Sequence, residues 1–358
     1  MSGIKVNLKC EKDFEGKAKH VFDTFKEWYN LKEGEDLTIG YGCDGDVFIP
    51  CEKEVKIVKI EEVEEMKEKG KIEFDLIKAI FFLTFTKRGI EYIEENGLYL
   101  TPLTDYYCDL LFELLRKVAR QKGIEIERKR EKKIILTHDV DLIRKKLYPL
   151  NFVDFYELYL INRKYKKYFP DTKIFFLSGI ERPYGSNYRA NSIFCRPLIF
   201  LSRYFFSEIG LHIANVKKII RDKKIIEKLS RKSVRSARAH YLLLDYPSDL
   251  LEYEKSGILY DFSMGYRDKI GFKCGTCRPF RAYSTAFDRK LKVKVYPLFI
   301  MDSAIYRMLK NNENIWEKIR KGKKEIEKFG GEVSILFHNI SPVKKLYPII
   351  LKKLLTNS

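Results

Sequence analysis

Short apolar segments alternate with helical patterns from residue 131 onward. The segments have the Val, Ile, Leu and Phe content of strands, and most of them end in polar residues. We expect seven strands: Lys133–Asp139, Lys173–Ser178, Glu208–His212, Val234–Tyr241, Ile258–Phe262, Lys292–Ile300 and Val333–His338. Helical patterns lie between them, notably at Val216–Leu229 and Asn314–Lys328. This alternation predicts an α/β fold with parallel strands, either a barrel or a doubly wound sheet.

The first 130 residues have a different organisation, with short strands and separate helices. Three segments have helical patterns: Ala18–Tyr29, Phe74–Thr86 and Asp105–Gln121. Leu37–Pro50 contains short strands separated by Gly and Asp turns, and Lys56–Glu61 alternates Val and Ile with charge, as a half-buried strand does. We therefore predict a smaller N-terminal α+β accessory domain at 1–130, followed by the α/β domain at 131–358.

The positive charge of the chain is concentrated in the second predicted domain. Across 358 residues, 69 Lys and Arg oppose 50 Asp and Glu, which gives a net charge of +19. Residues 1–130 hold 23 basic and 27 acidic side chains, so residues 131–358 hold 46 and 23. This excess predicts an anionic partner, such as an acidic glycan, a nucleic acid or anionic lipid. A Lys- and Glu-rich surface of the kind found in heat-adapted proteins explains part of it.

Several functional classes are disfavoured by the sequence. No apolar run reaches the roughly 18–20 residues of a transmembrane segment, and the first residues lack the apolar core of a signal peptide. We therefore expect a cytoplasmic protein. The sequence contains no Gly-rich phosphate loop and no known nucleic-acid recognition motif, which argues against a nucleotide-dependent enzyme and against specific nucleic-acid binding.

The seven cysteines do not form an evident metal site or disulfide framework. Their number is odd, and only Cys274 and Cys277 are close in sequence. A zinc ion requires about four ligands, so one such pair is weak evidence for zinc. Two buried thiols or one local disulfide is the favoured interpretation.

Four of the five histidines lie at the carboxyl ends of predicted strands. They are His138, His212, His240 and His338, whereas His20 lies within a predicted helix and is interpreted as structural. In a parallel α/β barrel, the active site forms at this end, where the loops that follow different strands converge. We therefore predict that these four histidines contribute to a functional site.

Two carboxylates accompany the first of these histidines, in Thr137-His-Asp-Val-Asp141. Residues two apart in a strand point to the same side, so Asp139 and Asp141 are expected to project together. Neighbouring carboxylates repel unless they share a metal or a proton, or one has a raised pKa. With the imidazoles of His212 and His240, they provide a mixed N/O set suited to zinc or another divalent metal. The alternative is that the two aspartates only cap the next helix.

These motifs resemble the polysaccharide deacetylase family of metal-dependent carbohydrate esterases. That family has Thr-Phe-Asp-Asp-Gly after its first strand, His-Ser/Thr-x-x-His after its third, and Leu-x-His near its end. The corresponding segments here are Thr137–Asp141, Glu208–Val216 and Leu336–His338. The chain also resembles a branch of the family with an extra N-terminal domain, through four segments: Phe74–Phe82, His138–Asp141, Arg238–Tyr241 and Gly271–Phe280.

The resemblance implies both a fold and a reaction. The fold is a distorted seven-stranded β/α barrel, and the reaction is hydrolysis of an N- or O-acetyl group on a sugar by metal-activated water. By the same resemblance, Asp139 is the catalytic base, His338 is the acid that protonates the leaving group, and His212 is a metal ligand. The metal is a divalent ion, with zinc as the first expectation.

Two positions depart from the family pattern. The family's metal-binding Asp falls on Val140 and its second histidine ligand on Val216, and neither valine binds a metal. We hypothesise that Asp141, His212 and His240 form the metal site instead. Because of the two valines, a catalytically altered glycan-binding protein stays an alternative, and a basic nucleic-acid-binding protein is a more distant one.

Arg238 and Arg278 are the substrate-binding residues that we expect from the sequence. An arginine stabilises a tetrahedral oxyanion or binds an acidic substrate, and a structural ion pair is an equal alternative for each of them. Asp302 follows a predicted strand and is a candidate to orient a histidine. The positive charge of residues 131–358 favours an acetylated sugar that is anionic or lipid-linked as the substrate.

Overall fold

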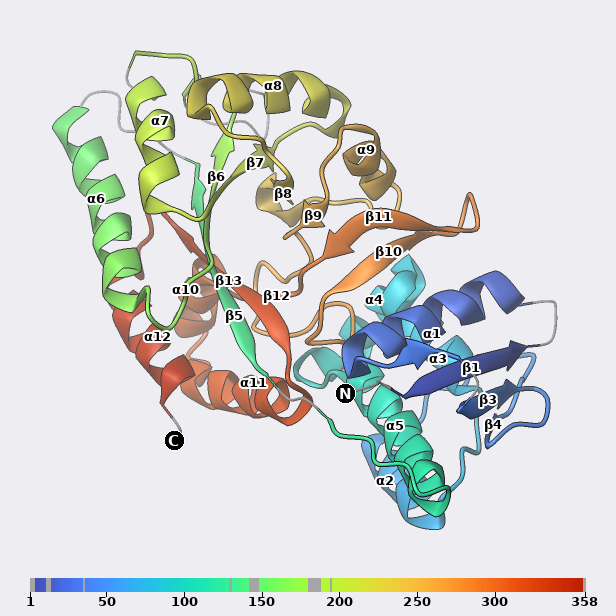
Figure 1. Cartoon of the computed structure of the whole chain (residues 1–358). Helices are drawn as coiled ribbons and strands as arrows, with labels where there is room; N and C mark the ends of the chain where they lie inside the picture. The colour runs from blue at the N-terminus through green and yellow to red at the C-terminus, as the bar shows by residue number, and fades with distance from the viewer. Residues whose placement is uncertain are drawn as a thin grey trace.

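Two β-sheets organise the chain (Figure 1). The computed structural model describes residues 4–10, 14–34, 36–128, 131–141, 148–179, 188–193 and 195–356. The first sheet has four strands and the second has nine. In the part of the chain so described, no helix is both long and apolar enough to cross a membrane.

The N-terminal sheet is parallel, with the strand order β2-β1-β3-β4. Its strands are β1 (Lys5–Cys10), β2 (Lys32–Glu33), β3 (Leu37–Tyr41) and β4 (Val47–Ile49). The helices of this part are α1 (Glu15–Tyr29), α2 (Ile60–Lys69), α3 (Leu76–Phe85), α4 (Lys87–Glu95) and α5 (Leu103–Gln121). The three predicted helices and the short strands after Leu37 are confirmed.

The predicted strand Lys56–Glu61 is wrong. The segment before Ile60 pairs with no strand, and α2 begins at Ile60. The backbone of Val58 is hydrogen-bonded to the Tyr107 hydroxyl instead of to a strand. This hydroxyl accepts a hydrogen bond from the Val58 N–H at 2.9 Å and donates one to the Val58 carbonyl at 2.8 Å. The alternating pattern therefore reflects the burial of Val58 beside a helix and not a place in a sheet.

The second sheet has the strand order β10-β11-β9-β8-β7-β6-β5-β13-β12. Its strands are β5 (Lys133–Val140), β6 (Thr172–Leu177), β7 (Glu208–Ile213), β8 (Ser236–Ala239), β9 (Tyr260–Asp261), β10 (Phe280–Ser284), β11 (Arg289–Val295), β12 (Leu298–Met301) and β13 (Glu332–His338). Neighbouring strands are parallel except β10 and β11. The sheet curves, with helices along its outer side (Figure 1). These helices are α6 (Tyr148–Tyr165), α7 (Arg196–Phe205), α8 (Ile219–Ser230), α9 (Asp249–Lys255), α10 (Asp302–Lys310), α11 (Ile315–Phe329) and α12 (Tyr347–Leu355).

The α/β class is confirmed, but the described sheet has nine strands where seven were expected. The predicted strand Lys292–Ile300 divides at Pro297 into β11 and β12, because proline has no N–H for a strand ladder. The two halves pair with different neighbours, β9 and β13. Strand β10, which forms a hairpin with β11, was not predicted. Within the described residues, the outer strands β10 and β12 do not pair with each other, so the sheet is curved and open.

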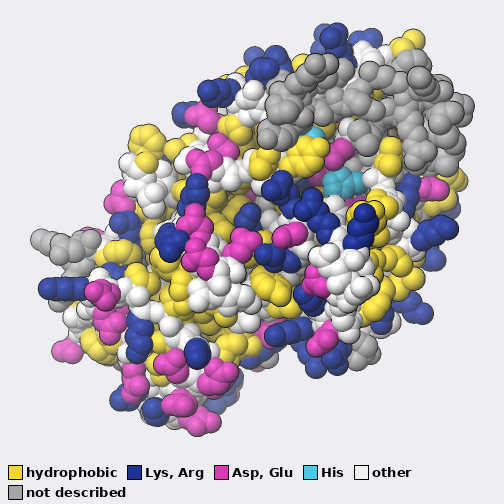
Figure 2. All heavy atoms as spheres, turned by 180° about the vertical axis from the view of Figure 1, so that it is seen from behind, with side chains coloured by type: hydrophobic (Ala, Val, Ile, Leu, Met, Phe, Trp, Pro, Cys, Tyr) yellow, Lys and Arg dark blue, Asp and Glu magenta, His cyan; other side chains and the backbone are white. Residues whose placement is uncertain are grey.

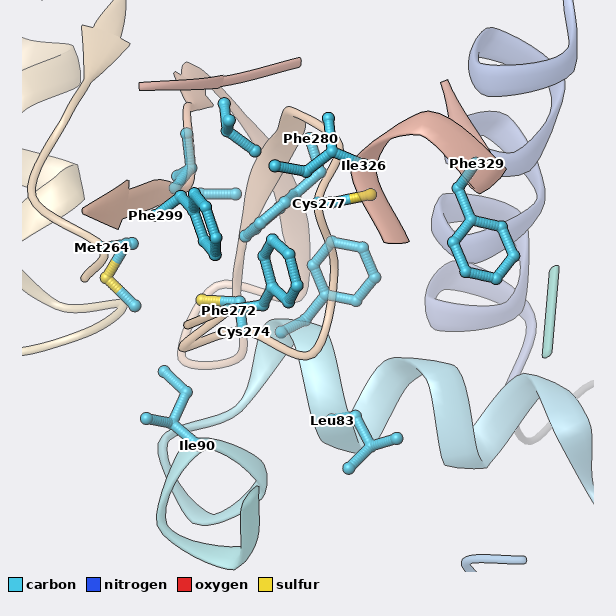
Figure 3. Packing of buried hydrophobic residues seen from close by; sticks show 14 of the residues in the cluster. Leu83, Ile90, Met264, Phe272, Cys274, Cys277, Phe280, Phe299, Ile326 and Phe329 are labelled. Atoms are coloured by element: carbon cyan, nitrogen blue, oxygen red, sulfur yellow. The ribbon is translucent and has the colours of Figure 1, made fainter. Parts of the chain in front are cut away.

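One hydrophobic core extends through both predicted domains. Figure 3 shows Leu83 and Ile90, from helices α3 and α4, near Phe272 and Phe299 of the second part. Cys274 and Cys277 lie in the same core as free, buried thiols, one of the two interpretations favoured for this pair. The division at residue 130 stays a prediction, because residues 129–130 lie outside the described ones.

His20 lies in the core between the two predicted domains, against Phe85 and Tyr283. Its titration makes the stability of the folded protein depend on pH. Its Nε2 lies 3.0 Å from the carbonyl of Arg281, which fixes the proton on that nitrogen. Burial, aided by the charge of Lys290, lowers the pKa of His20 to about 4. In the unfolded chain a histidine has a pKa of about 6.5, so below that pH only the unfolded chain binds the proton. The folded protein is therefore fully stabilised by neutral His20 above pH ~6.5 and loses this stability as the pH falls towards 4.

Replacing His20 with glutamine tests this dependence. The glutamine amide donates to the same carbonyl but does not titrate, so the variant is expected to lose less stability between pH 7 and pH 4.5. The difference from the unmodified protein should approach roughly 3 kcal/mol at the acidic end. Urea unfolding at several pH values measures it. Identical pH slopes for the two proteins would contradict the role of His20.

Candidate metal centre and catalytic site

The carboxyl ends of several parallel strands open into a cavity of about 260 Å³. Asp139 is the second-last residue of β5, His212 lies near the end of β7, and His338 is the last residue of β13. All three line the cavity together with Asp141 and Asp302. The position follows from the fold, because parallel strands carry their carboxyl ends to one edge of the sheet. Three of the residues singled out at strand ends, Asp139, His212 and His338, therefore line one cavity, and His138 and His240 do not line it.

Asp141 is the centre of the cluster. Its Oδ1 lies 3.0 Å from Nε2 of His212, and its Oδ2 lies 3.5 Å from Nε2 of both His240 and His338. The Nε2 of His212 is also 3.5 Å from Oδ2 of Asp139. Asp141 is thus surrounded by imidazoles, and the alternative of a helix cap concerns residues 142–147, which lie outside the described ones.

The orientation of His212 favours a cation between His212 and Asp141. Its Nδ1 lies 2.9 Å from the carbonyl of Arg238, so Nδ1 carries the proton and Nε2 of the neutral ring presents a lone pair. That lone pair faces Asp141 Oδ1, and both atoms are buried without a hydrogen-bond partner. Two acceptors this close require a proton or a metal ion between them. A backbone carbonyl that fixes the distant nitrogen of a histidine is typical of metal ligands.

Among the residues that the structure describes, two groups of side chains offer a metal ion three ligand atoms each. In one group, the atoms of Asp141, His212 and His240 all lie within 4.8 Å of one another. In the other, the same is true of Asp139, Asp141 and His338. The first group has the two imidazoles and one carboxylate that suit zinc and related divalent ions.

Asp139 is held from below by Arg238. The guanidinium donates to Asp139 Oδ1 and to the Thr137 hydroxyl, each at 2.8 Å, and to the carbonyl of Phe262 at 2.9 Å. Arg238 is fully buried, lies over the ring of Phe175 and does not line the cavity. The structural ion pair, one of the two predicted roles, is therefore what the geometry provides, and direct contact with a substrate is not.

Removing Arg238 is expected to destabilise the protein strongly. Arg238→Met leaves the carboxylate of Asp139 buried without its cation, which should lower the free energy of unfolding by about 3 kcal/mol. Arg235→Met is the matched control, because Arg235 is exposed just before the same strand; its effect should stay within about 0.5 kcal/mol. Chemical denaturation measures both. Equal losses in the free energy of unfolding for the two substitutions would show that the buried ion pair contributes no more to stability than an exposed arginine does.

His338 is positioned by Asp302, the first residue of α10. Nδ1 of His338 donates to Asp302 Oδ1 at 2.5 Å, and the backbone N–H of His338 donates to Oδ2 at 3.0 Å. The Tyr347 hydroxyl also donates to this carboxylate. Nε2 of His338 therefore points towards Asp141 and the cavity. Asp302 orients a histidine, as its place after a strand suggested, whereas Tyr347 carried no recognisable signal.

The charges in the cluster stabilise one another. Although burial opposes the charged form, the carboxylates of Asp302 and Asp141 raise the pKa of His338 to about 10. Burial likewise opposes ionisation of Asp141, but the charge of His338 and the neighbouring imidazoles hold the pKa of this carboxyl well below its usual value. His338 is therefore a cation and Asp141 an anion at neutral pH.

Two other predicted residues lie away from the cavity. His138 alternates with Asp139 along β5 and points to the opposite side, where its ring nitrogens lie 3.0 Å from Asn162 Oδ1 and 3.3 Å from the carbonyl of Phe337. Arg278 is buried beneath the rings of Trp28 and Tyr29, 3.3 Å from Asp105. It forms the structural ion pair that was the alternative to substrate binding, and it does not line the cavity.

The two valines that depart from the family pattern are apolar packing residues. Val140 is buried at the end of β5, and Val216 is half-buried against the core in a short 3₁₀ turn. Neither supplies a ligand. The two aspartates of the cluster flank Val140 in the sequence. Its histidines come from β7, from the turn after β8 and from the end of β13.

Several cavity residues were not found from the sequence. Tyr241 and Leu242 line the cavity with left-handed φ angles of 56° and 53°, which non-glycine residues rarely adopt. Such strain is concentrated at functional sites. Tyr306, Arg307 and Arg267 also line the cavity. No motif marked them, because they come from a helix and a loop whose positions depend on the folded sheet.

Comparison with solved structures finds proteins described as deacetylases. A candidate polysaccharide deacetylase from Mycobacterium smegmatis aligns over 65% of this chain and 87% of its own, with 13% identity and a TM-score of 0.43. Peptidoglycan deacetylase PdaC from Bacillus subtilis aligns over 63% and 83%, with 15% identity and a TM-score of 0.31. BA3943, a CE4 family pseudoenzyme from Bacillus anthracis, aligns over 63% and 60%, with 10% identity and a TM-score of 0.28. Neither a protein-family model nor a curated protein matches the chain.

The descriptions of these structures name the same kind of enzyme that the sequence motifs resemble. One of them also names a protein that has lost activity. Likenesses at this level of identity leave the function of this chain to be argued from its own residues.

Proposed function

We propose that this protein is a metal-dependent hydrolase that removes acetyl groups from an amino sugar or another acetylated glycan. The observation that carries the proposal is the convergence of Asp141, His212 and His240 beside Asp139 and His338. A cation site, a free carboxylate edge and a cationic imidazole around one cavity are the parts that amide or ester hydrolysis needs. For an N-acetyl group, the bond that breaks is a carbon–nitrogen bond outside a peptide.

Asp141, His212 and His240 would hold the metal. The buried, unpartnered Asp141 Oδ1 and His212 Nε2 fit such an ion, and their N/O chemistry favours zinc among divalent metals. When bound, the ion supplies Lewis-acid polarisation of a carbonyl and of water. The protein supplies the orientation, because the Arg238 carbonyl fixes the ring of His212.

Asp139 would act as the general base. Arg238 holds its Oδ1, so the other oxygen is left to accept a proton from the attacking water. The guanidinium also fixes the carboxylate of Asp139 in one orientation. As water adds to the acetyl carbon, its proton passes to this carboxylate.

His338 would act as the general acid. Its Nδ1 is committed to Asp302, so the proton on Nε2 is the one that faces the cavity. Transfer of that proton to the leaving nitrogen or oxygen accompanies cleavage of its bond to the acetyl carbon. The products are acetate and a free amino or hydroxyl group on the sugar.

Acetate release tests the proposal. The protein, reconstituted with zinc, cobalt, nickel or manganese in separate samples, is incubated with N-acetylglucosamine oligomers and with an O-acetylated glycan. Release that depends on the added metal is the expected result. No release from either substrate class with any of the four metals would overturn the proposal.

A second candidate function is glycan binding without turnover. Val140 and Val216 favour it, because both occupy positions where the family that the motifs resemble has metal ligands. Binding of the same oligomers without acetate release, unchanged by Asp139→Asn, would support this alternative. Calorimetry and acetate measurement on one sample distinguish the two.

A further inference from the structure

Two arginines at the cavity have no partner among the residues that the structure describes. Arg267 and Arg307 both line the cavity that holds Asp139 and His338, and both are exposed. Among the described residues, neither guanidinium makes a hydrogen bond or an ion pair with a protein group. By contrast, each of the three guanidinium nitrogens of Arg238 donates a hydrogen bond to a protein group.

The positive side chains continue along α10 into neighbouring hollows. Ser303, Arg307 and Lys310 are spaced four and three residues apart, so they share one face of the helix. Ser303 and Arg307 line the site cavity, and Arg307 and Lys310 line an adjoining hollow of about 550 Å³. Arg267 and Arg307 also line a third hollow of about 660 Å³. Arg307 therefore lies where the three hollows meet, and Arg267 borders two of them.

The acidic side chains around the adjoining hollow are already paired. Lys269 lies 2.9 Å from Glu94 and 3.9 Å from Asp268, and Lys318 lies 2.6 Å from Glu313. Lys310 forms no ion pair with a carboxylate of the described residues and lies 4.7 Å from the ring of Tyr306. The unneutralised charge of the hollow is therefore positive. Figure 2 shows one face of the molecule, on which Lys and Arg side chains (dark blue) lie next to exposed histidine atoms (cyan).

We infer that Arg267, Arg307 and Lys310 form an anion subsite for a phosphate or carboxylate group carried by the acetylated sugar. This inference rests on the proposed function and names the class of its substrate. Guanidinium groups bind both oxyanions with paired hydrogen bonds. Asp139, Asp141 and Asp302 repel an anion from the floor of the cavity, so the negative group lies towards α10 while the acetyl group faces Asp139.

Competition between charged and neutral substrates tests the subsite. The substrates are N-acetylglucosamine, its 1-phosphate and an N-acetylated uronic acid, the last two separating phosphate from carboxylate. For Arg267→Gln/Arg307→Gln, kcat/KM for the anionic substrate relative to the neutral one is expected to fall about 10- to 100-fold. The change should appear mainly in KM, and Arg307→Lys should recover part of it. Arg235→Gln removes one exposed arginine at the other end of β8 and should leave the ratio unchanged.

Binding separates failure of the subsite from failure of the proposed function. N-Acetylglucosamine 1-phosphate and the N-acetylated uronic acid are titrated into the unmodified protein, the double variant and Arg235→Gln by calorimetry, which requires no turnover. Affinity for at least one anion that falls about 10-fold or more in the double variant alone supports the subsite even if no acetate is released. Equal affinities of the three proteins for both anions, or an unchanged kcat/KM ratio in the double variant, overturn it.

Discussion

Asp139→Asn is expected to lower kcat for acetate release by about 10²- to 10⁴-fold. The asparagine side chain has the same shape and its oxygen still accepts from Arg238, but an amide does not take a proton from water at neutral pH. The proposed metal ligands Asp141, His212 and His240 are unchanged, so zinc binding should be retained. A loss in kcat with metal content and substrate KM near those of the unmodified protein is the signature of a missing base.

A matched control removes a carboxylate at the opposite edge of the same sheet. Asp171 precedes β6 and pairs with Lys133 at the amino-terminal end of the strands, so Asp171→Asn should leave acetate release unchanged. Thermal unfolding of both variants shows whether a loss of activity reflects a loss of fold, since Asp139→Asn leaves Arg238 without its anion. More than a tenth of the original kcat in a folded Asp139→Asn variant would exclude Asp139 as the general base.

The local part of the site could be predicted from the sequence because strand geometry is regular. Asp139 and Asp141 were placed together by the period of two, and His212 and His338 by the rule that active sites lie at the carboxyl ends of parallel strands. The same period also shows why His138 differs, since it alternates with Asp139 and must point to the other side. A histidine at a strand end therefore indicates a site residue only if its side chain points to the same side of the sheet as Asp139.

The long-range part of the site could not be predicted in this way. Arg238 and Arg307 have the same chemistry, yet one lies beneath Asp139 and the other on an exposed helix face. Their burial depends on which strands and helices become neighbours, and a sequence pattern does not specify this. Asp302 and Tyr347 reach His338 across 36 and nine residues of chain.

The fold shows the same division between local and long-range information. The strands of the second sheet other than β10 were predicted from their apolar patterns, and Pro297 within an expected strand was a sign that this strand would divide. The packing of α3 and α4 against the second part of the chain depends on contacts between distant segments, whereas the missed hairpin of β10 and β11 joins neighbouring segments. The strand count and the continuity of the core were accordingly the parts that required the structure.

His212→Gln is expected to weaken zinc binding by at least about 100-fold, because even the groups that orient a ligand contribute 10- to 100-fold. The glutamine side chain lacks the ring nitrogen that faces Asp141 Oδ1 at 3.0 Å. Zinc content after reconstitution and removal of free metal should fall from about one equivalent to less than about a tenth. His138→Gln is the matched control, since His138 also lies near the carboxyl end of a strand but contacts Asn162 and not the cavity; this variant should keep its zinc.

Two further variants decide which of the two ligand groups holds the metal. Both groups contain Asp141, but only the first contains His240 and only the second contains His338. The proposed site predicts that His240→Gln loses zinc, whereas His338→Gln keeps zinc and loses turnover, because His338 is bound to Asp302 and serves as the acid. The opposite outcome would assign the metal to Asp139, Asp141 and His338, and Asp139 would then be a ligand and not a base. Zinc retained by both variants would place the ion elsewhere and remove the basis of the proposed mechanism.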